Sequence, residues 1–107
     1  MRIGRLRHRV TIQTSESVRD SYGGQTTEWV NEKTVWASIE PLRGEERFLA
    51  QQVTASTTTK IVMRYRPLST DQRITHGETV YDIQSVIDPE ERHEMLEVMC
   101  TEGLTNG

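Results

Sequence analysis

The side chains that could bind a metal or attack a substrate are few and scattered in this 107-residue sequence. The histidines, His8, His76 and His93, are far apart, and none stands at metal-ligand spacing from Cys100 or from a carboxylate. Cys100 occupies an apolar position of a predicted strand, where a thiol packs as a small hydrophobic group. No glycine-rich phosphate loop, nucleophile elbow or zinc motif occurs, and the carboxylates are spread along predicted turns. The sequence therefore predicts no catalytic residue, metal site or cofactor, and no enzyme activity.

Charge is unevenly placed along the chain, although the formal net charge is only −3. The first nine residues carry no acid and four arginines, which are Arg2, Arg5, Arg7 and Arg9. Residues 88–102 carry six acids against Arg92. Two solvated ends would explain this asymmetry. The alternative is a basic interface that meets an acidic neighbour head to tail. Tight binding to duplex DNA is disfavoured, because it depends on clustered Lys and Arg that neutralise phosphates.

Length and composition predict a single domain over residues 1–107 with a thin core. The hydrophobic fraction is 34% and the charged fraction 27%, which leaves a large polar surface. A lone cysteine excludes an internal disulfide and fits a reducing compartment. The N-terminal arginines precede no apolar stretch, and apolar runs are only a few residues long, so we expect no signal peptide and no membrane association.

Alternation of apolar and polar side chains predicts strands along most of the chain. The predicted strands cover residues 7–14, 26–30, 34–40, 60–66, a short segment from 74, 80–86 and about 94–102. Turns are predicted at 31–33 and 76–78, one helical turn at 88–92, and a short helix at 45–53. With no βαβ rhythm, six or seven short strands and one helix indicate a mainly β fold, a small antiparallel barrel or sandwich.

Two of the connecting segments stand out. Thr14–Gln25 is polar and ends in Gly23-Gly24, which predicts a long, flexible loop of the kind that binds a partner. The short helix is marginal alone and needs something to pack on. Phe48, Leu49 and Val53 lie on one side of it, so one interpretation is that these residues dock the helix on the barrel.

The order of motifs resembles the phage head–tail joining proteins, also called head-closure or stopper proteins. The resemblance covers nearly the whole chain in register, and the ordered series is specific although each motif alone is weak. It is carried by Ile3–Gln13, Gly23-Gly24 followed by Trp29, Val35–Glu46, Arg64-Tyr65-Arg66-Pro67, Tyr81-Asp82-Ile83, and Asp88-Pro89 with Arg92, Leu96 and Cys100-Thr101-Glu102.

This resemblance implies a small β-barrel that assembles as a ring of identical subunits below the portal and its adaptor ring. Such a ring closes the DNA-filled head and presents the surface on which the tail docks. The implied partners are other copies of the chain, portal or adaptor proteins, and tail terminator or tail tube proteins, with packaged double-stranded DNA only as channel contents. The implied location is the neck of a phage or prophage virion, assembled in the bacterial host cytoplasm.

The resemblance also implies which segments retain DNA and which contact neighbouring proteins. A loop after the second main strand reaches into the channel and holds back DNA; here it is residues 43–59, with candidate gate residues Arg43, Glu45, Glu46, Arg47, Gln51, Gln52, Thr54 and Ser56. The other long loop would contact neighbouring subunits or the tail through Arg19, Asp20, Tyr22, Gly23 and Gly24. A gate needs a segment of low local stability, which a marginal helix beside a Ser/Thr run provides.

Two alternatives stay open at the level of the sequence. One is a small nucleic-acid-binding barrel, with stacking by Tyr65 or Trp36 and phosphate contacts from Arg2, Arg5, Arg7, Arg9, Arg64 and Arg66. The net acidic charge argues against it. The other is a different ring-forming tail subunit such as a tail terminator, which shares the ring habit but not this motif order.

Overall fold

Six antiparallel strands close into a barrel in the computed structural model, which describes residues 6–53 and 57–103. The strand order around the barrel is β1-β2-β3-β6-β5-β4, and β4 pairs with β1 to close it. The elements are β1 (His8–Arg19), β2 (Gln25–Pro41), α1 (Gly44–Val53), β3 (Thr59–Arg64), β4 (Arg73–His76), β5 (Thr79–Ile87), the short 3-10 turn η2 (Pro89–Glu91) and β6 (Met95–Gly103). The mainly β fold expected from alternation is confirmed as a barrel.

The barrel is held by one apolar core to which every strand contributes. Strands whose inward positions are apolar bury that side against one another, and each fully buried aliphatic side chain contributes roughly 1.5–3 kcal/mol. The core members are Val10, Ile12, Ala37, Ile61, Met63, Ile74, Tyr81, Ile83, Leu96, Val98 and Cys100. Cys100 is fully buried, as its strand position predicts. Burial raises the pKa of its thiol to about 12.

The predicted turn at residues 31–33 is wrong, because β2 runs through it without interruption. Ile12 pairs with Lys33 and Gln13 pairs with Asn31, so Glu32 is an extra residue in β2, a β-bulge. Because of this extra residue, the inward-facing positions of β2 are odd-numbered on the C-terminal side of the bulge and even-numbered on its N-terminal side. Val35 packs against the core on one side of the bulge, and beyond it Val30 takes the same side.

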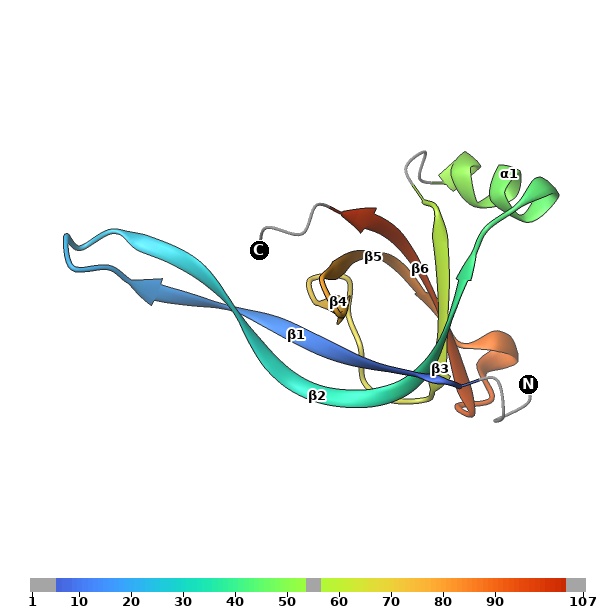
Figure 1. Cartoon of the computed structure of the whole chain (residues 1–107), viewed down its shortest axis with the longest axis horizontal. Coiled ribbons are helices and arrows are strands. Elements are labelled where there is room, and N and C mark those ends of the chain that lie inside the picture. Colours follow the sequence, from blue (N-terminus) through green and yellow to red (C-terminus); the bar gives the residue numbers. More distant parts are fainter. Residues whose placement is uncertain (1–5, 54–56, 104–107) are drawn as a thin grey trace.

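The predicted long loop at Thr14–Gln25 is also wrong. β1 continues to Arg19, and Arg19 pairs with Gln25 across a turn of residues 20–24. The result is a two-stranded ribbon that projects from the barrel and makes the molecule 49 Å long against 27 and 26 Å in its other directions (Figure 1). We call residues 14–30 the arm.

The C-terminal half follows the prediction closely. Gly77 adopts a left-handed conformation in the turn between β4 and β5, where only two residues join the paired His76 and Thr79. A short 3-10 turn, Pro89–Glu91, lies where one helical turn was expected at 88–92 and leads into β6. It is not a regular helical turn, because Glu90 and Glu91 have positive φ and the side chain of Asp88 does not cap it. No helix in the described ranges 6–53 and 57–103 is long and apolar enough to cross a membrane.

Candidate interaction surfaces

The arm is a ribbon in which β1 and β2 pair only with each other within the described part of the chain. Its ladder runs from the pair Thr14 and Val30 to the pair Arg19 and Gln25. Two-stranded ribbons are marginal in water because they bury little apolar surface. The arm therefore depends on contacts at its base and its tip.

An aspartate orders the tip of the arm. Asp20 Oδ1 accepts hydrogen bonds from the backbone N–H groups of Tyr22 (2.9 Å) and Gly24 (2.8 Å). Gly23 adopts φ +85°, which glycine tolerates at little cost. Tyr22 is 95% exposed and stands free at the end of the molecule. The five residues predicted as a contact loop are thus brought together at a short turn that these hydrogen bonds order.

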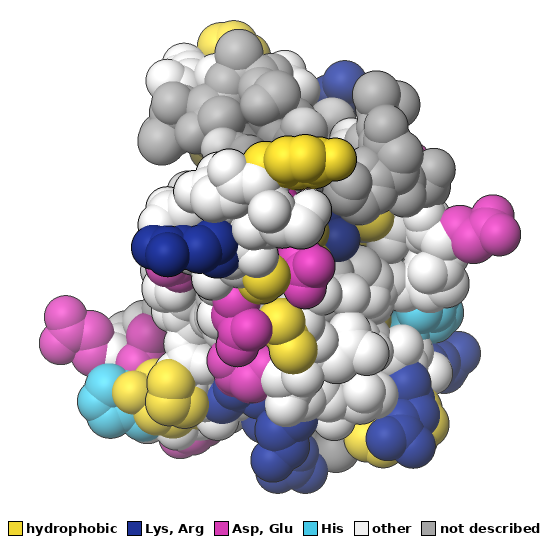
Figure 2. Space-filling view, turned by 90° about the vertical axis from the view of Figure 1, so that its left-hand side faces the viewer, with side chains coloured by type: hydrophobic (Ala, Val, Ile, Leu, Met, Phe, Trp, Pro, Cys, Tyr) yellow, Lys and Arg dark blue, Asp and Glu magenta, His cyan; other side chains and the backbone are white. Residues whose placement is uncertain are grey.

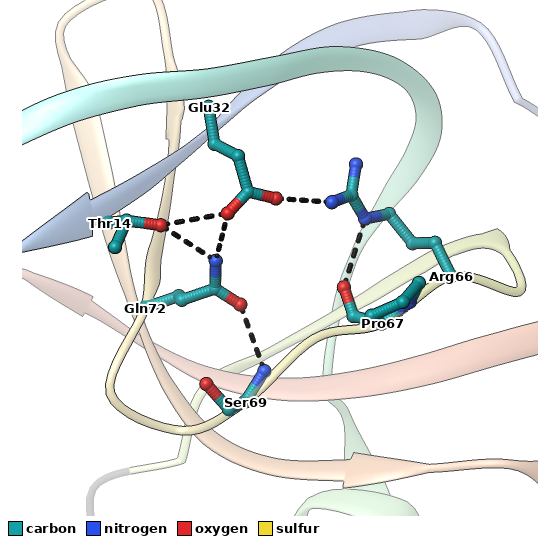
Figure 3. Close-up of polar contacts among 6 residues, drawn as sticks. All are labelled: Thr14, Glu32, Arg66, Pro67, Ser69 and Gln72. Atoms are coloured by element: carbon teal, nitrogen blue, oxygen red, sulfur yellow. Dashed lines mark hydrogen bonds and ion pairs between the residues drawn. The ribbon is translucent and has the colours of Figure 1, made fainter.

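A polar clamp fixes one side of the arm's base, where Glu32 occupies the bulge (Figure 3). Its carboxylate accepts hydrogen bonds from Thr14 Oγ1 (2.9 Å) and Gln72 Nε2 (2.8 Å) and forms an ion pair with Arg66. Gln72 in turn accepts a hydrogen bond from the backbone N–H of Ser69 (3.0 Å). Because these residues come from β1, β2 and the segment between β3 and β4, the clamp ties the bulge to the barrel wall.

An aromatic contact braces the other side of the base. The guanidinium carbon of Arg73 lies 4.3 Å from the ring centroid of Trp29, a cation–π geometry. Arg73 Nε also donates to Gln13 Oε1 (2.7 Å), and Gln13 Nε2 donates to Asn31 Oδ1 (2.9 Å). The sequence analysis missed the clamp and this brace, because their members lie up to 60 residues apart and form no local motif.

Helix α1 stands out from the barrel between the end of β2 and the start of β3 (Figure 1). Lys60 Nζ forms an ion pair with Glu46 Oε2 at 2.8 Å, and this hydrogen bond raises the pKa of Lys60. Gln51 Nε2 donates to the carbonyl of Thr57 (3.0 Å). Phe48 and Leu49 are 61% and 54% exposed. The interpretation that these two side chains dock the helix on the barrel is therefore wrong for the single chain.

The candidate gate residues that the structure describes differ in exposure and in their contacts. Arg43, Glu45, Arg47 and Gln52 are exposed around α1, whereas Glu46 and Gln51 hold the helix to β3 and to Thr57. Thr54 and Ser56 lie outside the described residues.

The basic N-terminal residues are described only in part, since Arg2 and Arg5 lie outside the described residues. Arg7 and Arg9 are exposed. The guanidinium carbon of Arg9 lies 5.3 Å from the ring centroid of Trp36, its cross-strand partner. Trp36 is 53% exposed. This places a basic and aromatic surface on the outer side of β1 and β2.

The histidines are closer in space than the sequence suggests. His8 and His76 contact each other edge to face, with ring centroids 5.0 Å apart. The ring centroids of His93 and Tyr65 lie 4.6 Å apart, and His93 Nδ1 lies 2.5 Å from Asp88 Oδ2. Within residues 6–53 and 57–103, no group of three or more potential ligands could hold a metal ion.

Comparisons with known proteins agree with the architecture. The sequence matches the family model described as phage head completion protein over residues 1–103. Head completion protein gp7 of Enterobacteria phage HK97 is 28% identical over 109 residues, covering 96% of this chain and 97% of that protein. The solution structure of protein SF1141 from Shigella flexneri 2a is similar, with a TM-score of 0.79, 32% identity and coverage of 99% and 100%.

A chain in the virion of a native gene transfer agent particle shares the fold, with a TM-score of 0.62, 22% identity and coverage of 94% of this chain and 97% of that one. The expected structural role in a head–tail connector agrees with the family match. The chain belongs to the phage head completion protein family.

Proposed function

We propose that this head completion protein assembles as a ring of identical subunits on the portal or adaptor ring, closes the DNA-filled head, and presents the surface on which a tail terminator or tail tube docks. The observation that carries the proposal is the contrast between a closed barrel and two projecting elements. The arm and α1 both leave the barrel with exposed apolar side chains, Tyr22 on one and Phe48 and Leu49 on the other. Such elements are typical of subunits that complete their burial in an assembly.

In this proposal α1 and the segment after it form the channel gate. A gate must change its position without unfolding the subunit, and α1 meets that requirement because its contacts are polar and peripheral. Duplex DNA must also pass without being gripped. Glu45, Glu46 and Gln52 offer no charge that neutralises phosphate, although Arg43 and Arg47 do.

The proposed role requires no catalysis. Cys100 is the only cysteine of the sequence, and its buried, protonated thiol is a poor nucleophile at neutral pH. In the described part of the chain the exposed surfaces include the arm, helix α1 and the outer side of β1 and β2 with Arg9 and Trp36, and these suit binding to other proteins. We place the protein in the virion neck, and its assembly in the host cytoplasm.

The test is to mix the purified chain with DNA-filled, tailless heads of its own phage and to image the heads by negative stain. The proposal predicts a ring of added density at the portal vertex and heads that then accept purified tails. Heads without added density, together with salt-dependent binding of the chain to free duplex DNA, would replace the connector by the nucleic-acid-binding alternative.

The gate has a separate test. Residues Glu45–Gln52 are replaced by a Gly-Ser linker of equal length, which leaves the barrel core intact. We expect the variant to fold and to bind heads, while the heads lose DNA that the unaltered protein retains. DNA retained equally well by both would remove the gate from α1.

A further inference from the structure

The arm has an inner face on which a pair of acids lies between two pairs of threonine and valine. Val10 and Ile12 point into the barrel, so Thr14, Glu16 and Val18 continue on the same side of β1. Their cross-strand partners share that side, and they are Val30, Glu28 and Thr26. In the described part of the chain, no residue of the arm belongs to the core or packs against it. Figure 2, which looks at the molecule end-on with the arm toward the viewer, shows acidic and hydrophobic side chains next to one another near its centre.

The pair in the middle of the inner face is unfavourable in the single chain. Glu16 and Glu28 lie directly opposite each other in the ladder, and both are exposed. Like charges at directly opposed positions destabilise a ribbon, which is already marginal with two strands. Neither carboxylate forms an ion pair within residues 6–53 and 57–103. A partner with positive charge would neutralise the repulsion between Glu16 and Glu28, and apolar contacts with that partner would stabilise the marginal ribbon.

The outer side of the barrel carries a surface with the complementary chemistry. Ala37 pairs with Met63 and both are buried, so the preceding Trp36 in β2 and the following Arg64 in β3 point outward next to each other. Arg9 in β1 pairs with Trp36 from the other side. We call Arg9, Trp36 and Arg64 the arginine–tryptophan surface. In the described part of the chain neither arginine forms an ion pair with an acid.

The two surfaces match in composition and in size. The arm offers two carboxylates and the apolar Val18 and Val30, and the arginine–tryptophan surface offers two guanidinium groups and the exposed indole of Trp36. The six residue pairs of the arm span about 20 Å. This length is comparable with the two shorter dimensions of the molecule, 27 and 26 Å, so an arm can lie across a neighbouring barrel. Because the arm and the surface lie on different parts of the chain, the contact is heterologous and repeats around a ring.

We propose that the inner face of the arm docks on the arginine–tryptophan surface of the next copy of this chain, with Glu16 and Glu28 paired to Arg9 and Arg64. The inference rests on the proposed ring and names the contact between its subunits. One face of the arm offers about 200 Å² for contact, far below the roughly 800 Å² per partner of a stable interface. The contact therefore forms on heads, where the portal vertex holds the subunits side by side, and the free chain is a monomer.

The test uses charge reversal on filled, tailless heads and measures the amount of protein bound per head. Glu16→Lys with Glu28→Lys reverses the charge of the arm's inner face, and Arg9→Glu with Arg64→Glu reverses the charge of the arginine–tryptophan surface. We expect each pair alone to lower binding at least tenfold, and all four substitutions in one chain to restore it to within about threefold of the unaltered protein. The control is Ser17→Lys with Thr27→Lys, which adds lysines at a cross-strand pair on the outer face of the same arm; it should bind normally.

The outcomes separate the inference from the proposed function. Failure of the unaltered protein to form a ring on heads refutes the proposed function. If that ring forms and the reversed arm still binds normally, the arm makes no such contact. If the reversed arm fails and the fourfold variant is not restored, the arm docks on another protein, and the inference is wrong.

A covalent test does not depend on binding strength. Val18→Cys on the inner face of the arm is combined with Thr34→Cys beside the arginine–tryptophan surface, and the assembled heads are oxidised. We expect a ladder of disulfide-linked multimers, because each chain would be joined to the next. Buried Cys100 does not compete. Monomers alone after oxidation of ring-bearing heads would contradict the contact.

Discussion

The barrel and the arm are built from the same two strands, yet they differ in what stabilises them. In the barrel, β1 and β2 contribute Val10, Ile12 and Ala37 to a core that every strand shares. In the arm, the same strands pair only with each other and carry polar residues on both faces. The barrel is complete within one chain, whereas the arm has the unpaired charge and exposed apolar surface of an element that needs a partner.

The bulge at Glu32 lies in β2 at the boundary between the barrel and the arm. It keeps the inward side of β2 continuous from Val35 to Val30, so that the face that is core in the barrel becomes a docking face in the arm. The clamp and the Trp29–Arg73 brace hold the direction of the arm without burying it. Assembly can then use an arm whose position is already set, which lowers the ordering cost of binding.

The largest expected effect is a loss of stability at alkaline pH, and the groups that cause it lie in the barrel strands and not in the arm. Burial raises the pKa of Cys100 from 9.0 to about 12, so above pH 9 the unfolded chain loses a proton that the folded barrel keeps. Stability is then full below pH 9 and falls by about 1.4 kcal/mol per pH unit up to pH 12. Burial of Tyr81 and the Lys60–Glu46 hydrogen bond raise the pKa of Tyr81 and of Lys60 as well, with the same sign.

Urea unfolding between pH 8 and 11 measures this loss, with Cys100→Ala as the matched variant. We expect the variant to show a shallower decline, because its core lacks the titrating thiol. Equal slopes for both proteins would show that Cys100 does not dominate the alkaline response.

A matched pair of valines gives the next largest effect. Val98 is fully buried in the barrel core, and Val98→Ala should lower the free energy of unfolding by about 2–3 kcal/mol. Val18→Ala on the arm should change it by no more than about 0.5 kcal/mol. Chemical denaturation measures both. Similar losses would mean that the arm is packed as firmly as the barrel in the free protein.

The clamp should have an intermediate effect. Glu32→Ala leaves the mostly buried Arg66 side chain without its acid and removes hydrogen bonds to Thr14 and Gln72, at an expected cost of about 1–2 kcal/mol. Glu28→Ala, four residues away on the arm, should be neutral or slightly stabilising because it removes the repulsion from Glu16. Urea unfolding compares the two, and a larger loss for Glu28→Ala would contradict the clamp.

Two turn glycines should give the smallest effect. Gly77 and Gly23 have positive φ, and an added Cβ meets no atom within 4 Å at either, so alanine costs only backbone strain of about 1 kcal/mol. Gly77→Ala should lower global stability by that amount, because its turn belongs to the barrel. Gly23→Ala should leave global stability unchanged and speed hydrogen exchange only in the arm. Equal global losses would show that arm and barrel unfold together.

The sequence predicted the barrel because its strands alternate, and alternation is the signature of a strand with one buried face. It did not predict the arm, because neither face of the arm is buried in the single chain. Without a buried face, residues such as Ser15, Ser17 and Thr27 show no alternation of apolar and polar side chains. Asn31-Glu32-Lys33 has the composition of a turn, and only the pairing with β1 shows that it is a bulge. The resemblance to a known family placed the predicted contact residues 19–24 in a long loop, whereas the structure places them at the tip of a β-ribbon; their role in contacts remains a prediction.

The interaction surfaces were less predictable than the fold. Arg9, Trp36 and Arg64 come from three strands and meet only when the register of the barrel is known. Glu32, Arg66 and Gln72 form their network through tertiary contacts without a local pattern. The assignment of the gate to α1 comes from the resemblance, and it remains a proposal.

The central claim is that the barrel is complete alone and the projecting elements are completed by assembly. Hydrogen exchange by mass spectrometry, on the free chain and on filled heads that carry it, tests this claim most directly. We predict equal protection of β3, β5 and β6 in both states, and rapid exchange of residues 14–30 and of α1 in the free chain that slows at least tenfold for the arm on heads. An arm that is as protected as the barrel in the free chain, or that stays unprotected on heads, would contradict it.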